Sequence, residues 1–123
     1  MKRDMDLVRR ILTVTEKAES AIDVNDLATD AHSMESVIYH VRMMEHHGLI
    51  DATVKFADDG CYVGWVTALT WDGCDYLDAI RDESVWRKTK QVVKETVGST
   101  TLDIIKETAK LVAMTAIKAQ LGL

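Results

Sequence analysis

The sequence predicts an α+β fold, mostly helical: a winged helix-turn-helix with a two-stranded wing and a C-terminal helical extension. Apolar residues repeat at helical spacing through residues 36–50, and Gly48 follows where a helix would end. Two runs of strand-like residues come next, separated by Asp58-Asp59-Gly60, whose Asp-Gly step favours a hairpin turn. The chain has no proline and only 6 glycines, which suits helices joined by short turns.

The first two helices are predicted before residue 31. The first extends from Asp4 to about Ala18, and it carries one apolar face. The residues of that face are Leu7, Val8, Ile11, Leu12 and Val14. A second, short helix is predicted over residues 24–30, with Asp23 as its N-cap. The negative charge of Asp26 is favourable near the positive N-terminal end of this helix.

The third helix is the one on which a helix-turn-helix depends. Its apolar residues fall at positions i, i+1, i+4 and i+7, which places them on one side. They are Val37, Ile38, Val41 and Met44. Ser33 is the predicted N-cap, and Gly48 is placed for a left-handed C-terminal cap. The strands of the wing are then predicted over residues 50–56 and 62–69.

Three more helical segments are predicted after the wing. Thr70 caps a helix over residues 71–81, and Asp82-Glu83-Ser84 either interrupts that helix or restarts it. The next segment continues from Val85 through Val97 and is ended by Gly98. Thr100 and Asp103 form a capping-box-like start for the last helix, over residues 101–120.

The domain organisation follows from these helices. Residues 1–82 form the predicted winged helix-turn-helix domain, and residues 83–123 form the C-terminal helical extension. The last helix carries more apolar surface than a winged-helix core needs. We therefore expect it either to pack back on the domain or to form a homodimer through residues 101–120.

The charge of the chain weighs against strong DNA binding. The net charge is −5, and residues 1–70 hold 7 Lys and Arg against 12 Asp and Glu. Residues 71–123 hold 8 of each class, so the acidic excess lies in the half that would read DNA. Sequence-independent DNA affinity comes mainly from Lys and Arg that displace counterions from phosphates.

The expected location is the cytoplasm. The apolar runs are far shorter than the roughly 20 residues that span a bilayer, so no membrane association is predicted. Residues 1–10 are charged throughout and do not resemble a signal peptide. Cys61 and Cys74 are expected to be reduced thiols rather than a disulfide.

The candidate DNA contacts are side chains on the outer side of the third helix, with cations from the wing and the first helix. They are Ser36, Tyr39, His40, Arg42, Lys55, Arg9 and Arg10. Arg and hydroxyl groups can reach base edges or phosphates in a major groove. However, residues 33–47 carry a formal charge of −1, and the wing tip is Asp58-Asp59. A protein partner on the same surface is therefore an equal alternative.

Other chemistry is weakly indicated. The four histidines and two cysteines do not form the paired spacings of a metal sensor, so no metal or cofactor is expected. His40 could equally pack or hydrogen-bond within the domain. Trp71 and Trp86 are interpreted as core anchors rather than a stacking platform. No catalytic signature occurs, so an enzyme is not expected.

Two local motifs resemble winged-helix regulators. His40-Val41-x-x-Met44-x-x-x-Gly48-Leu49-Ile50 resembles the corresponding run of small bacterial repressors of the arsenic-sensor type. Leu69-Thr70-x-x-Gly73-x-x-x-Leu77 is similar to the segment that leads out of the wing in winged-helix regulators. Both resemblances imply the fold more than the function.

Over nearly its whole length the chain is similar to an uncharacterised family of small bacterial proteins often found in phages and prophages. The most specific markers are Leu69-Thr70-Trp71-Asp72-Gly73, Leu77-Asp78-Ala79-Ile80-Arg81-Asp82 and Val85-Trp86-x-Lys88-Thr89-Lys90. The resemblance implies a winged helix and a mobile-element setting, and it brings no catalytic residues. The predicted role is a phage- or prophage-derived regulator that binds double-stranded DNA. The alternative is an interaction module for a host or phage protein.

Overall fold

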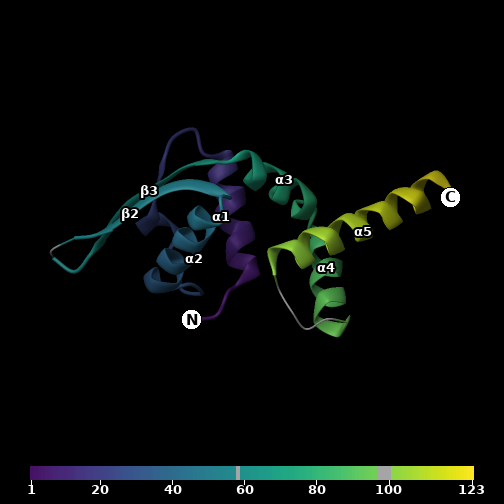
Figure 1. Cartoon of the computed structure of the whole chain (residues 1–123), viewed down its shortest axis with the longest axis horizontal. Helices are drawn as coiled ribbons and strands as arrows, with labels where there is room; N and C mark the ends of the chain where they lie inside the picture. Colours follow the sequence, from purple (N-terminus) through teal and green to yellow (C-terminus); the bar gives the residue numbers. More distant parts are fainter. Residues whose placement is uncertain (58, 97–100) are drawn as a thin grey trace. The chain divides into compact units, whose positions relative to one another are not determined.

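The computed structural model describes residues 1–57, 59–96 and 101–123, and within them helices predominate over one small sheet (Figure 1). In chain order the elements are α1 (Met5–Lys17), β1 (Ile22–Asp23), the 3₁₀ helix η1 (Val24–Leu27), α2 (Met34–His46), β2 (Ile50–Phe56), β3 (Tyr62–Leu69), α3 (Trp71–Ile80), α4 (Glu83–Thr96) and α5 (Leu102–Leu121). The chain divides into two compact units, Met1–Asp75 and Tyr76–Leu123. This division falls inside α3, before the predicted domain boundary at residue 82.

The core of the first unit forms between α1, α2 and the sheet. Asp4 caps α1 by accepting a hydrogen bond from the Leu7 amide at 3.1 Å, so the predicted start of this helix is confirmed. Leu7, Ile11 and Leu12 are fully buried on the inner side of α1. Most of the predicted apolar face of the first helix is therefore buried in the core, as expected, although Val14 is only half-buried.

The predicted second helix is wrong in extent. Only Val24–Leu27 is helical, as a 3₁₀ turn capped by Asp23 as expected, and the backbone is extended at Ala28. Thr29 and His32 exchange two backbone hydrogen bonds of 2.9 and 3.2 Å, and the Thr29 hydroxyl accepts a third from the His32 amide. These local bonds give the backbone an alternative to continuing the helix.

The helix α2 has the predicted caps and the predicted inner side. Ser33 accepts a hydrogen bond from the Ser36 amide at 3.2 Å, and Val37 and Val41 are completely buried. Gly48 has a φ of +85°, the left-handed conformation that ends a helix and that glycine adopts without a steric penalty. Periodicity and caps together therefore predicted α2 correctly.

The sheet is antiparallel, with strand order β1-β3-β2. The strands β2 and β3 have the predicted bounds and pair from Ile50 opposite Leu69 to Phe56 opposite Tyr62. The short strand β1 was not predicted, because two residues are too few to show an alternating pattern. Two helices beside a three-stranded sheet that ends in a long hairpin are consistent with the predicted winged helix.

The second unit contains the end of α3 together with α4 and α5. Asp82 accepts hydrogen bonds from the Ser84 hydroxyl and the Val85 amide at 2.6 and 2.9 Å, which restarts the helix as α4. The helices α4 and α5 pack against each other, and the deeply buried side chains of this unit include Trp86 and Ile105. The N-cap of α5 is Thr101, one residue after the predicted one. Thr100 and Gly98 lie outside the described residues. Among the described residues, no helix is long and apolar enough to cross a membrane.

Candidate nucleic-acid interface

The outer side of α2 is the surface on which the predicted contacts were placed. Glu35, Tyr39, Arg42 and His46 follow one another at steps of four, three and four residues, so they lie on one side of the helix. Glu35, Arg42 and His46 are exposed, and Tyr39 is half-buried. Because the opposite side of α2 is packed in the core, this stripe is the part of the helix that a ligand could reach.

The electrostatics of this stripe are mixed. Arg42 is its only Lys or Arg, while Glu35 and Glu45 give α2 a formal charge of −1. His46 Nε2 lies 3.7 Å from the Glu45 carboxylate, so a protonated His46 would form an ion pair with Glu45. Arg42 is therefore the residue of α2 best suited to a phosphate or a guanine edge.

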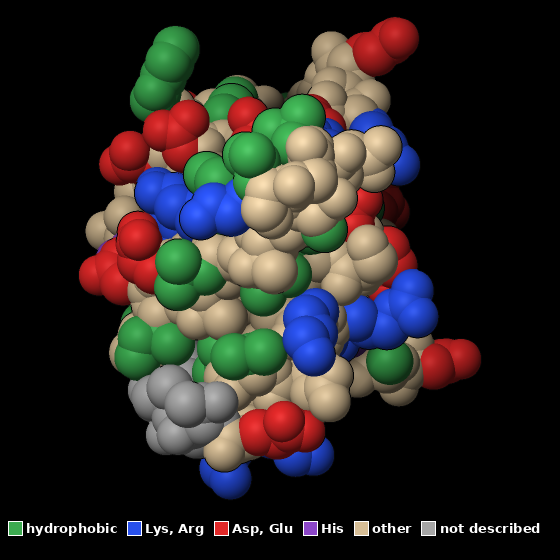
Figure 2. All heavy atoms as spheres, turned by 90° about the vertical axis from the view of Figure 1, so that its right-hand side faces the viewer, with side chains coloured by type: hydrophobic (Ala, Val, Ile, Leu, Met, Phe, Trp, Pro, Cys, Tyr) green, Lys and Arg blue, Asp and Glu red, His purple; other side chains and the backbone are tan. Residues whose placement is uncertain are grey.

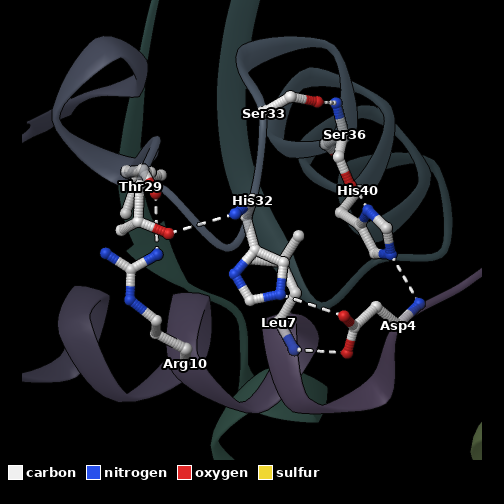
Figure 3. Close-up of polar contacts among 9 residues, drawn as sticks. Asp4, Leu7, Arg10, Thr29, His32, Ser33, Ser36 and His40 are labelled. Carbon is white, nitrogen blue, oxygen red and sulfur yellow. Dashed lines mark hydrogen bonds and ion pairs between the residues drawn. The ribbon is translucent and has the colours of Figure 1, made fainter.

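His40 is a correction to the predicted contact set. Its side chain is 2% exposed, and both ring nitrogens are engaged inside the first unit. The Asp4 amide donates to Nε2 at 2.7 Å, so Nδ1 carries the proton and donates to the Ser36 carbonyl at 2.7 Å (Figure 3). His40 thus ties the start of α1 to α2 and is not positioned to contact DNA.

Asp4 and His32 extend this network to the segment before α2. His32 Nε2 donates to the Asp4 carboxylate at 2.9 Å, and the Leu7 amide donates to its other oxygen (Figure 3). Partial burial acts to raise the pKa of Asp4, but the hydrogen bonds from His32 and Leu7 outweigh it and hold the pKa below its ordinary value. The network fixes how α1 and the segment before α2 meet the helix that carries Arg42.

The two arginines predicted on the first helix are less accessible than expected. Arg10 is half-buried, and its Nη1 donates to the Leu27 carbonyl at 2.7 Å, at the end of η1 (Figure 3). Arg9 is also half-buried. Arg10 therefore has a structural role that sequence reasoning missed, because its partner lies 17 residues away in the chain.

The β2–β3 hairpin carries the remaining predicted cation and a set of exposed aromatic side chains. Lys55 is exposed on β2, directly opposite Val63. Phe56 is 62% exposed and meets Tyr62 edge-on, with ring centroids 5.2 Å apart. On the central strand, Trp65 is 47% exposed. The hairpin thus offers more apolar contact surface than positive charge.

Hydrogen bonds at the base of the hairpin join the two motifs that resemble winged-helix regulators, residues 40–50 and 69–77. The Thr70 hydroxyl donates to the Gly48 carbonyl, and the Thr70 amide donates to the Leu49 carbonyl at 3.1 Å. The same hydroxyl caps α3 by accepting from the Gly73 amide at 3.0 Å. A Cβ on Gly73 would lie 1.9 Å from the Leu49 carbonyl oxygen. Glycine is therefore needed where α3 meets the turn that leads from α2 into the hairpin.

One of the two tryptophans predicted to be core anchors is buried, and the other is exposed. Trp86 is 1% exposed and is a core residue, as expected, whereas Trp71 is 84% exposed and is not a core anchor. Cys61 and Cys74 are exposed free thiols. No group of three or more potential metal ligands occurs within residues 1–57, 59–96 and 101–123.

Comparison with known proteins places the chain in a family. Residues 2–100 match the family described as hypothetical protein DUF2513. The chain belongs to this family. A relative of close to the same length occurs in Haemophilus influenzae and is described as an uncharacterized protein. It is 32% identical over an alignment of 115 residues, and the match covers 91% of this chain and 95% of that protein.

A solved structure from Thermoplasma acidophilum, described as a "putative transcriptional regulator", resembles this DUF2513 chain. The TM-score is 0.51 with 12% sequence identity, over 79% of this chain and 95% of the other. At this identity the similarity concerns the fold alone.

Proposed function

We propose that this DUF2513 protein is a non-enzymatic winged-helix regulator that binds double-stranded DNA in the cytoplasm. In this proposal α2 is the recognition helix and the β2–β3 hairpin is the wing. The observation that carries the proposal is the exposed stripe of α2, which presents Tyr39 and Arg42 while the other side of the helix is buried. The regulator-like fold of the Thermoplasma protein supports it. The phage or prophage origin implied by the sequence resemblance stays a prediction.

Each contact residue has a role that its chemistry allows. Arg42 would donate to a guanine edge or to a phosphate, and the hydroxyl groups of Ser36 and Tyr39 would bind nearby phosphate or base atoms. Lys55, exposed on the hairpin, would contact the backbone of the duplex. His40 is left out of this set because it is buried.

The acidity of the first unit predicts weak binding that depends strongly on its few cations. Residues 1–75 contain 7 Lys and Arg against 14 Asp and Glu, a formal charge of −7. Each neutralised phosphate contributes about −0.9 to the slope of log K against log salt concentration. A protein that uses only Arg42, Lys55 and a few residues of the N-terminus should therefore show a shallow salt dependence.

The test is binding of the full chain to a labelled pool of random duplex DNA at low and at near-physiological salt. Arg42→Ala should weaken binding and reduce the salt slope by about one if Arg42 contacts a phosphate. Arg87→Ala is the matched control, because Arg87 is an exposed arginine on α4, outside the proposed interface. Equal effects of the two substitutions would show that α2 is not the binding surface.

A protein-binding function is the second candidate, and two observations favour it. The first unit is strongly acidic, and its hairpin exposes Phe56 and Trp65. Aromatic side chains are enriched in the centres of protein interfaces. Absence of DNA binding even at low salt would overturn the DNA proposal and leave a protein partner for this surface as the better account.

A further inference from the structure

The second half of α5 exposes an apolar surface that the proposed function does not use. Residues 111–123 contain one charged side chain, Lys118. Four large apolar residues of this half lie at positions i, i+3, i+6 and i+10 and so share one side of the helix. They are Leu111, Met114, Ile117 and Leu121, and they are 70%, 50%, 51% and 66% exposed. We call these four residues the α5 face.

A groove continues this surface toward α4. It has a volume of about 560 Å³, and its apolar lining includes Val92 and Val93 of α4 with Val112 and Ala116 of α5. Leu111 lines the groove and also belongs to the α5 face, so the two surfaces are continuous. Figure 2, which looks toward the C-terminal end of the chain, shows hydrophobic side chains in patches between separated charged ones.

The chemistry of the surface limits what can cover it. A helix that is apolar on most of its circumference is normally buried. Helices that lie on membranes carry Lys and Arg along their polar side, and nucleic acids require several cations. The helix α5 carries Lys106, Lys110 and Lys118 against Asp103 and Glu107, a formal charge of +1, and Lys88 lines the groove. This is less positive charge than either arrangement uses. A partner that matches the α5 face must itself be apolar with a complementary charge at its edge.

We propose that the α5 faces of two copies of this chain pair in an antiparallel manner about a two-fold axis. In the register that charge favours, Leu111 of one helix lies level with Met114 of the second copy, and Ile117 and Leu121 lie level with Thr108 and Ile104. Glu107 precedes Leu111 by four residues, and Lys118 follows Met114 by four residues. This register sets Glu107 of each copy beside Lys118 of the other.

Charge selects this arrangement over a parallel one. A parallel two-fold pair would place Lys118 level with Lys118 and Glu107 level with Glu107, which is repulsive. In the single chain, Glu107 lies 3.4 Å from Lys110, but both side chains are more than half exposed. Such a surface pair contributes little, so Glu107 can exchange Lys110 for Lys118 of the second copy at little cost. Antiparallel packing also aligns the opposed helix dipoles favourably.

The experiment measures self-association of the full chain by sedimentation equilibrium without DNA, so its outcome is independent of the proposed function. Ile117→Asp should weaken dimerisation by at least about tenfold, because it would bury a charge in the interface. Gln120→Asp is the matched control, since Gln120 is exposed and lies outside the α5 face. It should leave the dissociation constant within about threefold of wild type.

Charge reversal tests the register. Glu107→Lys and Lys118→Glu should each weaken the dimer by about fivefold, and the double variant should restore it. A wild-type chain that stays monomeric at high micromolar concentration would overturn the proposal, as would a dimer insensitive to Ile117→Asp. Failure of the double variant to recover association would overturn the antiparallel register. Circular dichroism of each variant verifies that the helices are retained.

Discussion

Alanine in place of Gly73 should destabilise the protein, although Gly73 lies within a helix. The added Cβ would lie 1.9 Å from the Leu49 carbonyl oxygen and 3.0 Å from its carbonyl carbon. Both are backbone atoms, so no side-chain rotation can relieve the overlap. Restoring ordinary contact requires α3 to move by about 1.5 Å from the turn that joins α2 to β2.

The change in the free energy of unfolding caused by Gly73→Ala is the sum of opposing effects. Alanine is favoured over glycine inside a helix by about 1 kcal/mol. Overpacking typically costs about 1–3 kcal/mol. Moving α3 also strains the Thr70 hydrogen bonds to Gly48 and Leu49, each of which contributes about 1 kcal/mol. The net expectation is a loss of roughly 2 kcal/mol in the free energy of unfolding.

Urea unfolding followed by circular dichroism measures this loss. Gly48→Ala is the matched control, because no atom lies within 4 Å of its added Cβ and only its φ of +85° is unfavourable. That substitution should cost about 1–2 kcal/mol through the backbone alone. If Gly73→Ala proved as stable as wild type or more stable, helix propensity would outweigh the contact and the reasoning would be wrong.

Two further predictions concern the network around Asp4. His40→Leu should lower the free energy of unfolding by about 2 kcal/mol, because the Asp4 amide and the Ser36 carbonyl lose their hydrogen bonds to the imidazole ring. The control is Met43→Leu, at an exposed position of α2, which should change the free energy of unfolding by less than about 0.5 kcal/mol in the same urea titration. Because the pKa of Asp4 is lowered in the folded state, its contribution is present above the unfolded pKa of about 3.9 and is lost as pH falls through the folded pKa. Asp4→Asn should therefore flatten the fall of stability below about pH 4, and an unchanged acid slope would contradict this account.

The elements that the sequence predicted well are those whose signal is local. The caps and periodicity of α2, and the alternation in β2 and β3, depend on residues within one segment. The strand β1 was not predicted, because two residues are too few to show the alternation of apolar and polar residues. The helix expected over residues 24–30 stopped at Leu27 because Thr29 and His32 bond to each other instead.

The candidate site was harder to predict because burial depends on residues distant in the chain. Helical spacing placed His40 near the edge of the outer side of α2. In the structure its ring is buried and accepts a hydrogen bond from the Asp4 amide, 36 residues away in the chain. Likewise, Arg10 was expected to face a phosphate, and its guanidinium instead binds the carbonyl of Leu27. Arg42 needs no distant partner, and periodicity alone identified it as exposed.

The most direct test of the account is to map which residues a duplex contacts. Backbone amide shifts of the full chain, recorded by nuclear magnetic resonance during titration with DNA recovered from the random pool at low salt, give that map. The account predicts the largest changes along the outer side of α2, at Glu35, Tyr39, Arg42 and His46, with smaller ones at Lys55. Changes confined to other segments, or none along α2, would contradict the proposal that this helix reads DNA.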